Sequence, residues 1–278
     1  MIQSLLRRSV LFVPWRLRGA IKSLPLVAPL QRRLLATFLE GREFVHTVDA
    51  GPARGLSYPI RLPDDKGIWT GTYELELATL IARAVKAGDV CLDVGGWRGF
   101  FSGVMALAGA KRVFVFEPLP ANAVHILRML ELNSALAIEL IQAAVGDGGG
   151  SLDFEVMAES SMGKLATSSF QMGSPFGHKI SVRVVGVDDL IAAGTFESPA
   201  VLKIDVEGAE MFVLQGARQL LASRKPKLFI EVHTPELANE CSAFLQQFGY
   251  DISVLEELKQ RKVYPYPNIC HFIVAPRN

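Results

Sequence analysis

The sequence predicts an α/β protein in which a mostly parallel sheet is covered by helices on both faces and preceded by an N-terminal extension. From Tyr73 onward, short apolar runs typical of strands alternate with longer segments whose apolar residues recur at helical spacing. The predicted strands are apolar throughout, as in parallel sheets that are buried on both faces. The chain has 278 residues, half of them hydrophobic, which is enough for one such domain and an extension.

Strands and helices follow one another regularly through this domain. Asp147 and the three glycines after it predict a turn, and residues 157–180, rich in Ser, Gly and Met without a period, predict a loop. We expect strands at residues 90–93, 113–117, 138–144, 152–156, 200–205, 227–232, 251–255 and 270–275. We expect helices at residues 73–87, 100–108, 120–134, 209–222 and 235–248.

The extension contains two kinds of element. Residues 2–24 and 29–40 mix Leu, Val and Ile with Arg at roughly helical spacing, which predicts amphipathic helices. Residues 43–49 and 56–62 alternate like strands around a turn that contains Gly and Pro, which predicts a β-hairpin. The predicted division is an extension, residues 1–72, and a domain, residues 73–278.

Charge is distributed unevenly along the chain. Residues 1–42 carry eight basic residues and one acid, Glu40, for a net charge of +7, whereas the remainder carries 21 basic and 27 acidic residues, for a net charge of −6. Such a basic, partly apolar segment suits a contact with the acidic body, a homodimer contact, or a peripheral contact with an anionic membrane. We expect a protein contact, because amphipathic helices usually cover a core. The overall charge of +1 gives no support for nucleic-acid binding.

The cysteines and the N-terminal residues predict a cytoplasmic protein. Cys91, Cys241 and Cys270 are odd in number and far apart, which disfavours a secreted disulfide framework. The short apolar run at residues 9–15 is not followed by the small residues of a signal-peptide cleavage site, and no apolar run is long enough to span a bilayer.

A glycine-rich turn follows the first strand of the domain. The strand ends near Asp93, and Gly95, Gly96 and Gly99 lead into the next predicted helix. Glycines let the backbone approach a ligand, and a helix N-terminus offers unpaired N–H groups. Glu117 ends the second strand, 18 residues beyond Gly99, where a carboxylate can accept both hydroxyls of a ribose. This combination predicts a nucleoside cofactor.

The spacing of the glycines separates two classes of enzyme. A dinucleotide-binding turn has the pattern G-x-G-x-x-G, whereas the pattern here is D-x-G-x-x-x-G, which suits a cofactor without a pyrophosphate. A nicotinamide-dependent oxidoreductase is therefore the less favoured alternative. A tight turn that binds no ligand is the purely structural explanation.

The chain also contains a series of short motifs beyond this turn. In order, they are Gly71-Thr72-Tyr73-Glu74, Asp93-Val94-Gly95-Gly96, Phe116-Glu117-Pro118-Leu119-Pro120-Ala121-Asn122, Asn133, Ala144-Val145-Gly146-Asp147, Asp188-Asp189-Leu190, Lys203-Ile204-Asp205-Val206-Glu207-Gly208-Ala209-Glu210, Pro226 and Glu231. With these motifs the chain resembles the FkbM family of methyltransferases over about residues 69–275. It departs from the family at Gly95-Gly96-Trp97, where the family usually has Gly-Ala-Asn.

The resemblance implies a class I, Rossmann-like fold with a seven-stranded sheet, S-adenosylmethionine as methyl donor, and methylation of a hydroxyl on a sugar or small-molecule natural product. The glycines would pass beneath the methionine part of the cofactor, and Glu117 would bind the ribose hydroxyls. Pro118 and Asn122 would flank the adenine, and Ala144, at the end of the third strand, would lie at its edge. The expected cofactor-binding residues are Asp93, Gly95, Gly96, Gly99, Glu117, Pro118, Asn122 and Ala144.

Acidic residues gather where two adjacent strands should end. An alcohol has a pKa near that of water, about 15.7, so a base or a metal ion must assist the loss of its proton. Asp205 should end the fourth strand and His233 should end the fifth. We expect Asp205, helped by His233, to handle this proton without a metal. The alternative is a magnesium site formed by Asp205, Glu207 and Glu231.

Other roles are open for some of these residues. His233 could instead cap the helix that begins near Pro235, and Lys203 could be the ion-pair partner of a nearby carboxylate. A non-catalytic adaptor built on a methyltransferase fold is a further possible function. The presence of Glu117 and Asp205 argues against it.

Overall fold

The structure is a computed structural model that describes residues 43–62, 65–156, 163–165, 178–255 and 269–277. The chain divides into two compact units, Met1–Leu75 and Glu76–Asn278. The helices predicted at residues 2–24 and 29–40, like the whole basic segment, lie outside the described residues. Within the described parts of the chain, no helix has both the length and the apolar character needed to cross a membrane.

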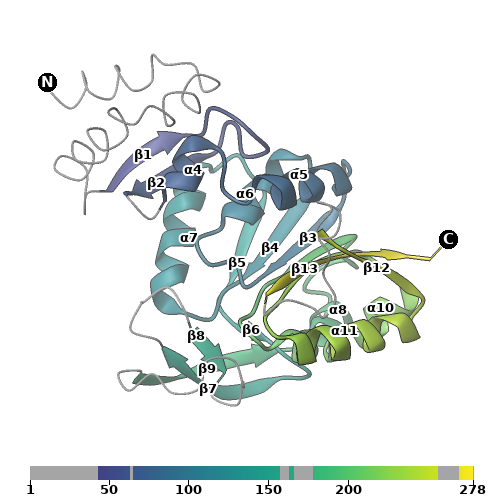
Figure 1. Cartoon of the computed structure of the whole chain (residues 1–278). Helices are drawn as coiled ribbons and strands as arrows, with labels where there is room; N and C mark the ends of the chain where they lie inside the picture. Colours follow the sequence, from purple (N-terminus) through teal and green to yellow (C-terminus); the bar gives the residue numbers. More distant parts are fainter. Residues whose placement is uncertain (1–42, 63–64, 157–162, 166–177, 256–268, 278) are drawn as a thin grey trace, which may run out of the picture. The chain divides into compact units, whose positions relative to one another are not determined.

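In the first unit, the predicted hairpin is confirmed. Strands β1 (Glu43–Thr47) and β2 (Ser57–Arg61) pair antiparallel, and the short helix α4 (Lys66–Thr70) follows them (Figure 1). The ring of Trp69 in α4 lies edge-on to the ring of Phe44 in β1, with the ring centroids 6.3 Å apart. The sequence did not predict α4, because a five-residue helix is too short to show a helical period.

The second unit contains the predicted seven-stranded sheet, in the order β12-β13-β11-β10-β3-β4-β5 (Figure 1). Strand β13 is antiparallel to β11 and β12, and the other neighbours are parallel. The strands are β3 (Val90–Val94), β4 (Arg112–Phe116), β5 (Ile138–Ile141), β10 (Val201–Ile204), β11 (Lys227–Val232), β12 (Tyr250–Val254) and β13 (Cys270–Pro276). The strand order reverses between β3 and β10, and sheets of this kind bind ligands beyond the carboxyl ends of the strands at such a point.

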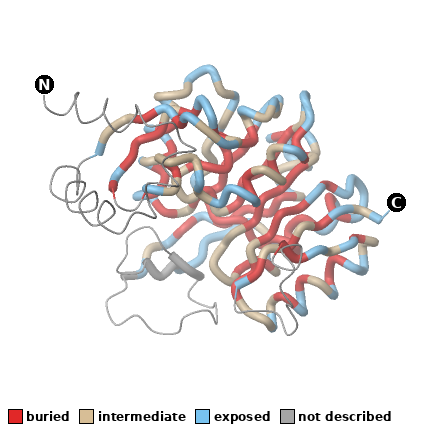
Figure 2. Tube along the Cα trace, turned by 45° about the horizontal axis from the view of Figure 1, so that its top comes forward, coloured by how far each residue is buried: buried red, intermediate tan, exposed pale blue. Residues whose placement is uncertain are grey.

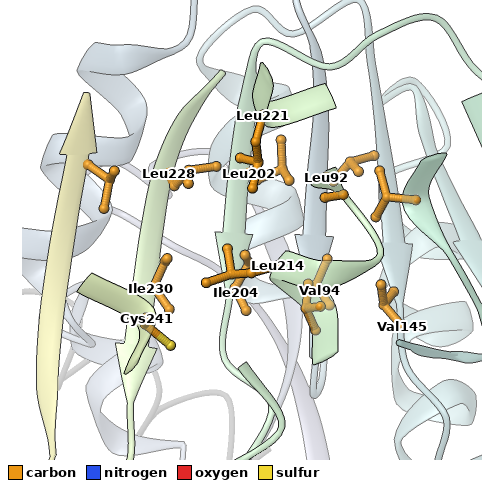
Figure 3. Packing of buried hydrophobic residues seen from close by; sticks show 14 of the residues in the cluster. Leu92, Val94, Val145, Leu202, Ile204, Leu214, Leu221, Leu228, Ile230 and Cys241 are labelled. Carbon is orange, nitrogen blue, oxygen red and sulfur yellow. The ribbon is translucent and has the colours of Figure 1, made fainter. Parts of the chain in front are cut away.

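One face of the sheet carries apolar side chains in rows across the strands, as Figure 3 shows. The strand register gives the rows Leu92–Leu202–Leu228 and Val94–Ile204–Ile230. Helices α9, α10 and α11 cover these rows with Leu214, Leu221 and Cys241 respectively. The three helices span Glu210–Gln215, Arg218–Ser223 and Pro235–Gln247.

The opposite face is covered by helices α6 (Phe100–Leu107) and α7 (Pro120–Leu132), with α5 (Leu75–Ala84) beside them (Figure 1). Side chains alternate along a strand, so Asp93 points to this face, together with Lys203, its partner in the strand register. Every residue of β3 and β10 is buried, and Figure 2 shows how buried residues gather in the interior. These two charged groups therefore lie in the core, where charges are stable only when paired.

A smaller sheet, in the order β6-β9-β7-β8, corrects one prediction. The third strand of the main sheet ends at Ile141, and Ala144–Val145 form β6, which pairs with β9 (His178–Val185). A tight turn, in which Ala143 N–H donates to Ile141 at 2.8 Å, separates β5 from β6. The apolar run is continuous in the sequence across this turn, so hydrophobicity does not reveal the change of sheet.

The loop predicted at residues 157–180 is also corrected where it is described. Residues Gly163–Leu165 form β8, and β9 begins at His178; the rest of the predicted loop lies outside the described residues. The turn predicted after Asp147 is confirmed, and it leads into β7 (Gly150–Val156). Strand β7 pairs antiparallel with both β8 and β9.

The helix predicted at residues 209–222 is two short helices, α9 and α10, separated near Gly216. A Cβ at Gly216 would lie 1.8 Å from the carbonyl oxygen of Gly146, so the two backbones are in direct contact. Asp188, in α8 (Val187–Ala192), donates its N–H to the Gly216 carbonyl, and its carboxylate accepts from two N–H groups in the first turn of α10. These bonds start the second helix, and apolar periodicity does not show them.

Candidate active site

The glycine turn after β3 wraps around the end of β4. The N–H groups of Gly95 and Gly96 both donate to the carbonyl oxygen of Phe116, each at 3.0 Å, and Gly99 donates to Gly96 at 2.7 Å. Helix α6 begins directly after Gly99. The three glycines expected at the cofactor therefore lie in one turn at the carboxyl edge of the sheet.

Gly95 also brings this turn against the next strand. Its φ angle is +77°, and a Cβ there would lie 1.8 Å from the carbonyl oxygen of Asp205. Glycine permits both the left-handed backbone and this close approach. The turn after β3 and the residue that follows β10 are therefore in backbone contact, which puts Asp205 next to the predicted cofactor turn.

Trp97, the departure from the family pattern, has a left-handed backbone with a φ of +48°. Asn adopts this conformation more readily than a bulky aromatic residue. The Arg98 guanidinium lies 4.8 Å from the centroid of the Trp97 ring, a cation–π contact, and the Trp97 N–H donates to Glu117 at 2.9 Å. The backbone of the turn thus stays anchored to β4 despite the larger side chain.

Glu117 follows β4 and is 4% exposed. Its Oε2 accepts from the Trp97 N–H and its Oε1 from the Leu119 N–H, each at 2.9 Å, and the Asn122 side chain adds a further hydrogen bond. Burial raises the pKa of Glu117 to about 7, and these bonds only partly oppose it. A carboxylate has about four acceptor positions, so it retains capacity for a ribose hydroxyl. The residues present therefore fit a nucleoside cofactor.

The remaining residues expected at the adenine lie near the end of β4. Asn122 is buried in the first turn of α7, and Pro118 is half-buried next to Glu117. Ala144 packs with Leu119 in a small apolar cluster. It reaches this place from β6 rather than from the third strand of the main sheet, where the sequence put it.

Lys203 has the ion-pair role that the sequence left open. Its Nζ donates to the Gly95 carbonyl at 2.8 Å and to Asp205 Oδ2 at 3.2 Å, and lies 3.6 Å from Asp93 Oδ1. Burial opposes its charge, but the charges of Asp205 and Asp93 raise the pKa of Lys203 above its ordinary value. The other oxygen of Asp93 accepts from Ser102 Oγ at 2.6 Å. Asp93 is thus a fully buried support for the turn.

Four residues converge at the carboxyl ends of β10 and β11: Asp205, Glu207, Glu231 and His233. We call them the acidic rim. Because β10 and β11 are parallel neighbours, the His233 Nε2 lies 3.7 Å from Asp205 Oδ1, 3.4 Å from Glu207 Oε2 and 3.8 Å from Glu231 Oε1. One atom each of Asp205, Glu231 and His233 lies within 4.8 Å of the others, close enough to hold a metal ion. The structure therefore brings together the candidate residues of both sequence hypotheses.

Glu210 holds His233 in this orientation, a role that the sequence analysis did not assign. His233 Nδ1 lies 2.7 Å from Oε1 of Glu210, which is fully buried. Burial opposes a charge on the ring, but Glu210, Asp205 and Glu207 raise the pKa of His233 to about 9. Helix α11 is capped by Thr234, which accepts from its own helix at 3.1 Å. His233 is therefore a rim residue rather than the cap of that helix.

His271 is a second residue that sequence reasoning missed. It lies opposite Glu231 in the pairing of β11 with β13, and its Nε2 is 3.2 Å from Glu231 Oε2. Burial opposes the charge of Glu231, but the contact with His271 and the charge of His233 lower the pKa of that carboxyl below its ordinary value. Only the strand pairing indicates this contact. Glu210, in contrast, stands in the motif at residues 203–210.

Comparison with known proteins gives a consistent result. The chain matches the family model described as "Methyltransferase FkbM domain" over residues 89–252. Over 162 residues it is 25% identical to the hexuronic acid methyltransferase AglP of Haloferax volcanii. The aligned residues make up 58% of this chain and 62% of AglP, so the chain spans less than two thirds of the length of that relative.

Two solved structures of methyltransferases are also similar to the chain. Methyltransferase FkbM from Methylobacillus flagellatus KT has 19% identity and a TM-score of 0.46, covering 77% of this chain and 56% of that one. Precorrin-6y C5,15-methyltransferase from Geobacter metallireducens GS-15 has 15% identity and a TM-score of 0.46, covering 73% of this chain and 89% of that one.

Proposed function

The chain belongs to the FkbM methyltransferase family, whose methyl donor is S-adenosylmethionine, and we propose that it methylates a hydroxyl of a sugar or small-molecule natural product. The backbone contact between Gly95 and Asp205 carries the proposal, because it sets the acidic rim beside the cofactor turn. The family match gives no support to the alternative of a nicotinamide-dependent oxidoreductase.

S-adenosylmethionine supplies a methyl group on a positively charged sulfur: as the acceptor oxygen bonds to the methyl carbon, the carbon–sulfur bond breaks, sulfur keeps the electron pair, and the hydroxyl loses its proton. Glu117 and the glycine turn orient the donor. We propose Asp205 and His233 as the catalytic residues that face the hydroxyl. Lys203 holds Oδ2 of Asp205, which leaves Oδ1 toward the rim, and the rim carboxylates receive the proton.

Two observations support a sugar as the acceptor: the relative AglP is a hexuronic acid methyltransferase, and the carboxylates of the rim can accept hydrogen bonds from sugar hydroxyls. The test is a screen with labelled S-adenosylmethionine against sugar, uronic acid and polyketide alcohols, with matched amines as competitors. We expect O-methylated products, identified by mass spectrometry. Methylation of the amines alone, or of carbon, would contradict the proposal.

The raised pKa of Glu117 makes cofactor binding depend on pH. Ribose hydroxyls donate stronger hydrogen bonds to an ionised carboxylate than to a protonated carboxyl. The pKa of Glu117, about 7, therefore sets the pH at which these bonds weaken. Affinity for S-adenosylhomocysteine should therefore be high at pH 8 and fall as the pH drops through about 7. Calorimetry from pH 6 to 8 measures it, and the Glu117→Gln variant should bind about 1–3 kcal/mol more weakly at pH 8.

The Glu117→Gln variant also distinguishes the pH dependence that Glu117 causes from the pH dependence that ionisation of the ligand causes. In Glu117→Gln the remaining pH dependence belongs to other groups, so the wild-type curve should be clearly steeper. Glu139→Gln, which changes a carboxylate that is exposed on β5 and paired with Arg112, should behave as wild type. Equal pH dependence in wild type and Glu117→Gln would show that Glu117 does not bind the ribose.

We also propose that the basic segment, residues 1–42, makes a protein contact within the chain or in a homodimer. Its net charge of +7 complements the −6 of the remainder. We expect no flotation of the full chain with phosphatidylserine vesicles at physiological salt, and a change of oligomeric state or stability when the segment is removed. Flotation that needs the segment and is lost at high salt would point to a membrane contact.

A further inference from the structure

We propose that the acidic rim binds one divalent metal ion, with Asp205, Glu231 and His233 as its protein ligands. The part that this ion plays in the reaction rests on the proposed function, whereas the site itself rests on the geometry of the rim. The sequence favoured a metal-free rim and offered magnesium on carboxylates as the alternative. The structure adds His233 as a nitrogen ligand and shows how each ligand is held.

The distances from His233 to the two carboxylates are close to those between the ligands of a single ion. Nitrogen and oxygen ligands lie about 2.0–2.2 Å from such an ion, so neighbouring ligand atoms lie about 3.0–3.6 Å apart. The His233 Nε2 is 3.7 Å from Asp205 Oδ1 and 3.8 Å from Glu231 Oε1. These two distances are longer than hydrogen bonds and exceed the expected spacing by only a few tenths of an ångström. The three ligand atoms all lie within 4.8 Å of one another, so a modest contraction around the ion would complete the site.

Each ligand offers one atom to the rim and has its other polar atom held by a partner. For Asp205, Oδ2 is bound by Lys203 and Oδ1 faces the rim. For Glu231, Oε2 contacts His271 at 3.2 Å and Oε1 faces the rim.

The third ligand, His233, follows the same pattern. Its Nδ1 is bound by the buried Glu210, and its Nε2 faces the rim. A carboxylate on the far nitrogen of a histidine is the usual partner of a metal-binding imidazole, because it fixes the orientation of the ring. Each of the three ligands thus has a partner on its second polar atom, which distinguishes the rim from an ordinary group of surface acids.

The charge around the rim also suits a cation. The rim carboxylates and the buried Glu210 lie around His233, which is 2% exposed. The positive charge of Lys203 is divided between Asp205 and Asp93. Carboxylates in such a place need a counter-charge. The protonated His233 ring supplies one positive charge, and a metal ion would replace its proton at Nε2. Two carboxylates and one imidazole are suited to Mn²⁺ or Zn²⁺, and less to Ca²⁺, which prefers oxygen ligands only.

An ion at the rim would lower the pKa of the acceptor hydroxyl and orient it. Asp205 and His233 would then act on the hydroxyl as ligands of the ion, and Glu207, the rim carboxylate that is not a ligand, would accept the proton.

Titration of the full chain with Mn²⁺, after removal of metal by a chelator, tests the site directly. We expect one Mn²⁺ per chain by calorimetry and by electron paramagnetic resonance. Asp205→Asn and Glu231→Gln, both partly exposed and nearly isosteric changes, should weaken Mn²⁺ binding by at least about 10-fold, and Glu210→Gln by about 10–100-fold. Circular dichroism verifies that each variant is folded.

Glu197→Gln is the matched control. Glu197 is an exposed carboxylate that pairs with Lys111 before β10, away from the carboxyl ends of the strands, so its loss should leave Mn²⁺ affinity unchanged. Absence of Mn²⁺ binding, or equal Mn²⁺ affinity in wild type, Asp205→Asn and Glu231→Gln, would overturn the proposed site.

Activity with and without chelator separates this inference from the proposed function. Methyl transfer that is lost on chelation and restored by Mn²⁺ supports a role of the ion in the reaction. Full methyl transfer in the chelated enzyme would overturn that role and leave the methyltransferase proposal intact. Specific Mn²⁺ binding without transfer to any hydroxyl would support the metal site and count against the proposed function.

Discussion

The substitution Asp205→Asn should lower the rate of methyl transfer by about 10²-fold or more, with little change in cofactor affinity. We expect this loss whether Asp205 accepts the proton directly or binds a metal ion. The amide of Asn can neither accept the hydroxyl's proton nor replace an anionic metal ligand. Binding of the donor should persist, since Glu117 and the glycine turn do not use the Asp205 side chain. Single-turnover kinetics with a saturating donor and an accepted hydroxyl substrate measure the effect.

Glu197→Gln again serves as the control, and its rate should equal that of the wild type. Because Asp205 pairs with Lys203, the thermal midpoint of the Asn variant should be compared with the wild type so that a loss of folding is not mistaken for a loss of chemistry. A rate within about threefold of the wild type would show that Asp205 has no catalytic role. A wild-type chain that binds the donor but turns over no acceptor would favour the adaptor alternative.

Gly95→Ala should be among the most disruptive single-methyl changes in the protein. Its Cβ would stand 1.8 Å from the Asp205 carbonyl oxygen, so the backbone of the turn or of the residue after β10 must move. Its φ of +77° adds a left-handed strain of about 1–2 kcal/mol. We expect a total loss of about 3 kcal/mol or more in the free energy of unfolding, and weaker cofactor binding by at least about 10-fold.

Gly88→Ala is the matched comparison for Gly95→Ala. Its φ is +91°, also left-handed, but a Cβ there would meet nothing within 4 Å. This variant should therefore show the backbone strain alone, about 1–2 kcal/mol in urea unfolding, with unchanged cofactor affinity. If both variants lose the same stability and bind the cofactor equally, the close approach between Gly95 and Asp205 does not matter.

The sequence by itself determined the order of the main elements and the position of the glycine turn. Continuous apolar strands between amphipathic helices predicted the buried parallel sheet. The glycines before α6 and the acid after β4 are local features, set by backbone freedom and strand length, so their spacing correctly indicated a tight turn before α6 and a carboxylate after β4. Their contact with the cofactor stays a prediction. Asp205 and His233 were placed at the same edge because parallel strands end together.

Only the tertiary structure decided features that depend on contacts between distant segments. The break between α9 and α10 comes from Gly216 against Gly146, and the transfer of Ala144 to a second sheet comes from its pairing with β9. Neither leaves a periodic signal in the chain, because a backbone contact or a change of strand partner does not alter the hydrophobic pattern.

The same holds for the residues that hold the acidic rim. His271 meets Glu231 because the last strand pairs antiparallel with β11, and Glu210 meets His233 because α9 packs against α11 and its neighbours. Whether a carboxylate and an imidazole lie 3 Å or 20 Å apart depends on this packing, and their electrostatic coupling depends on that distance. The sequence therefore supplied the candidate ligands, and the fold determined which atom of each faces the rim.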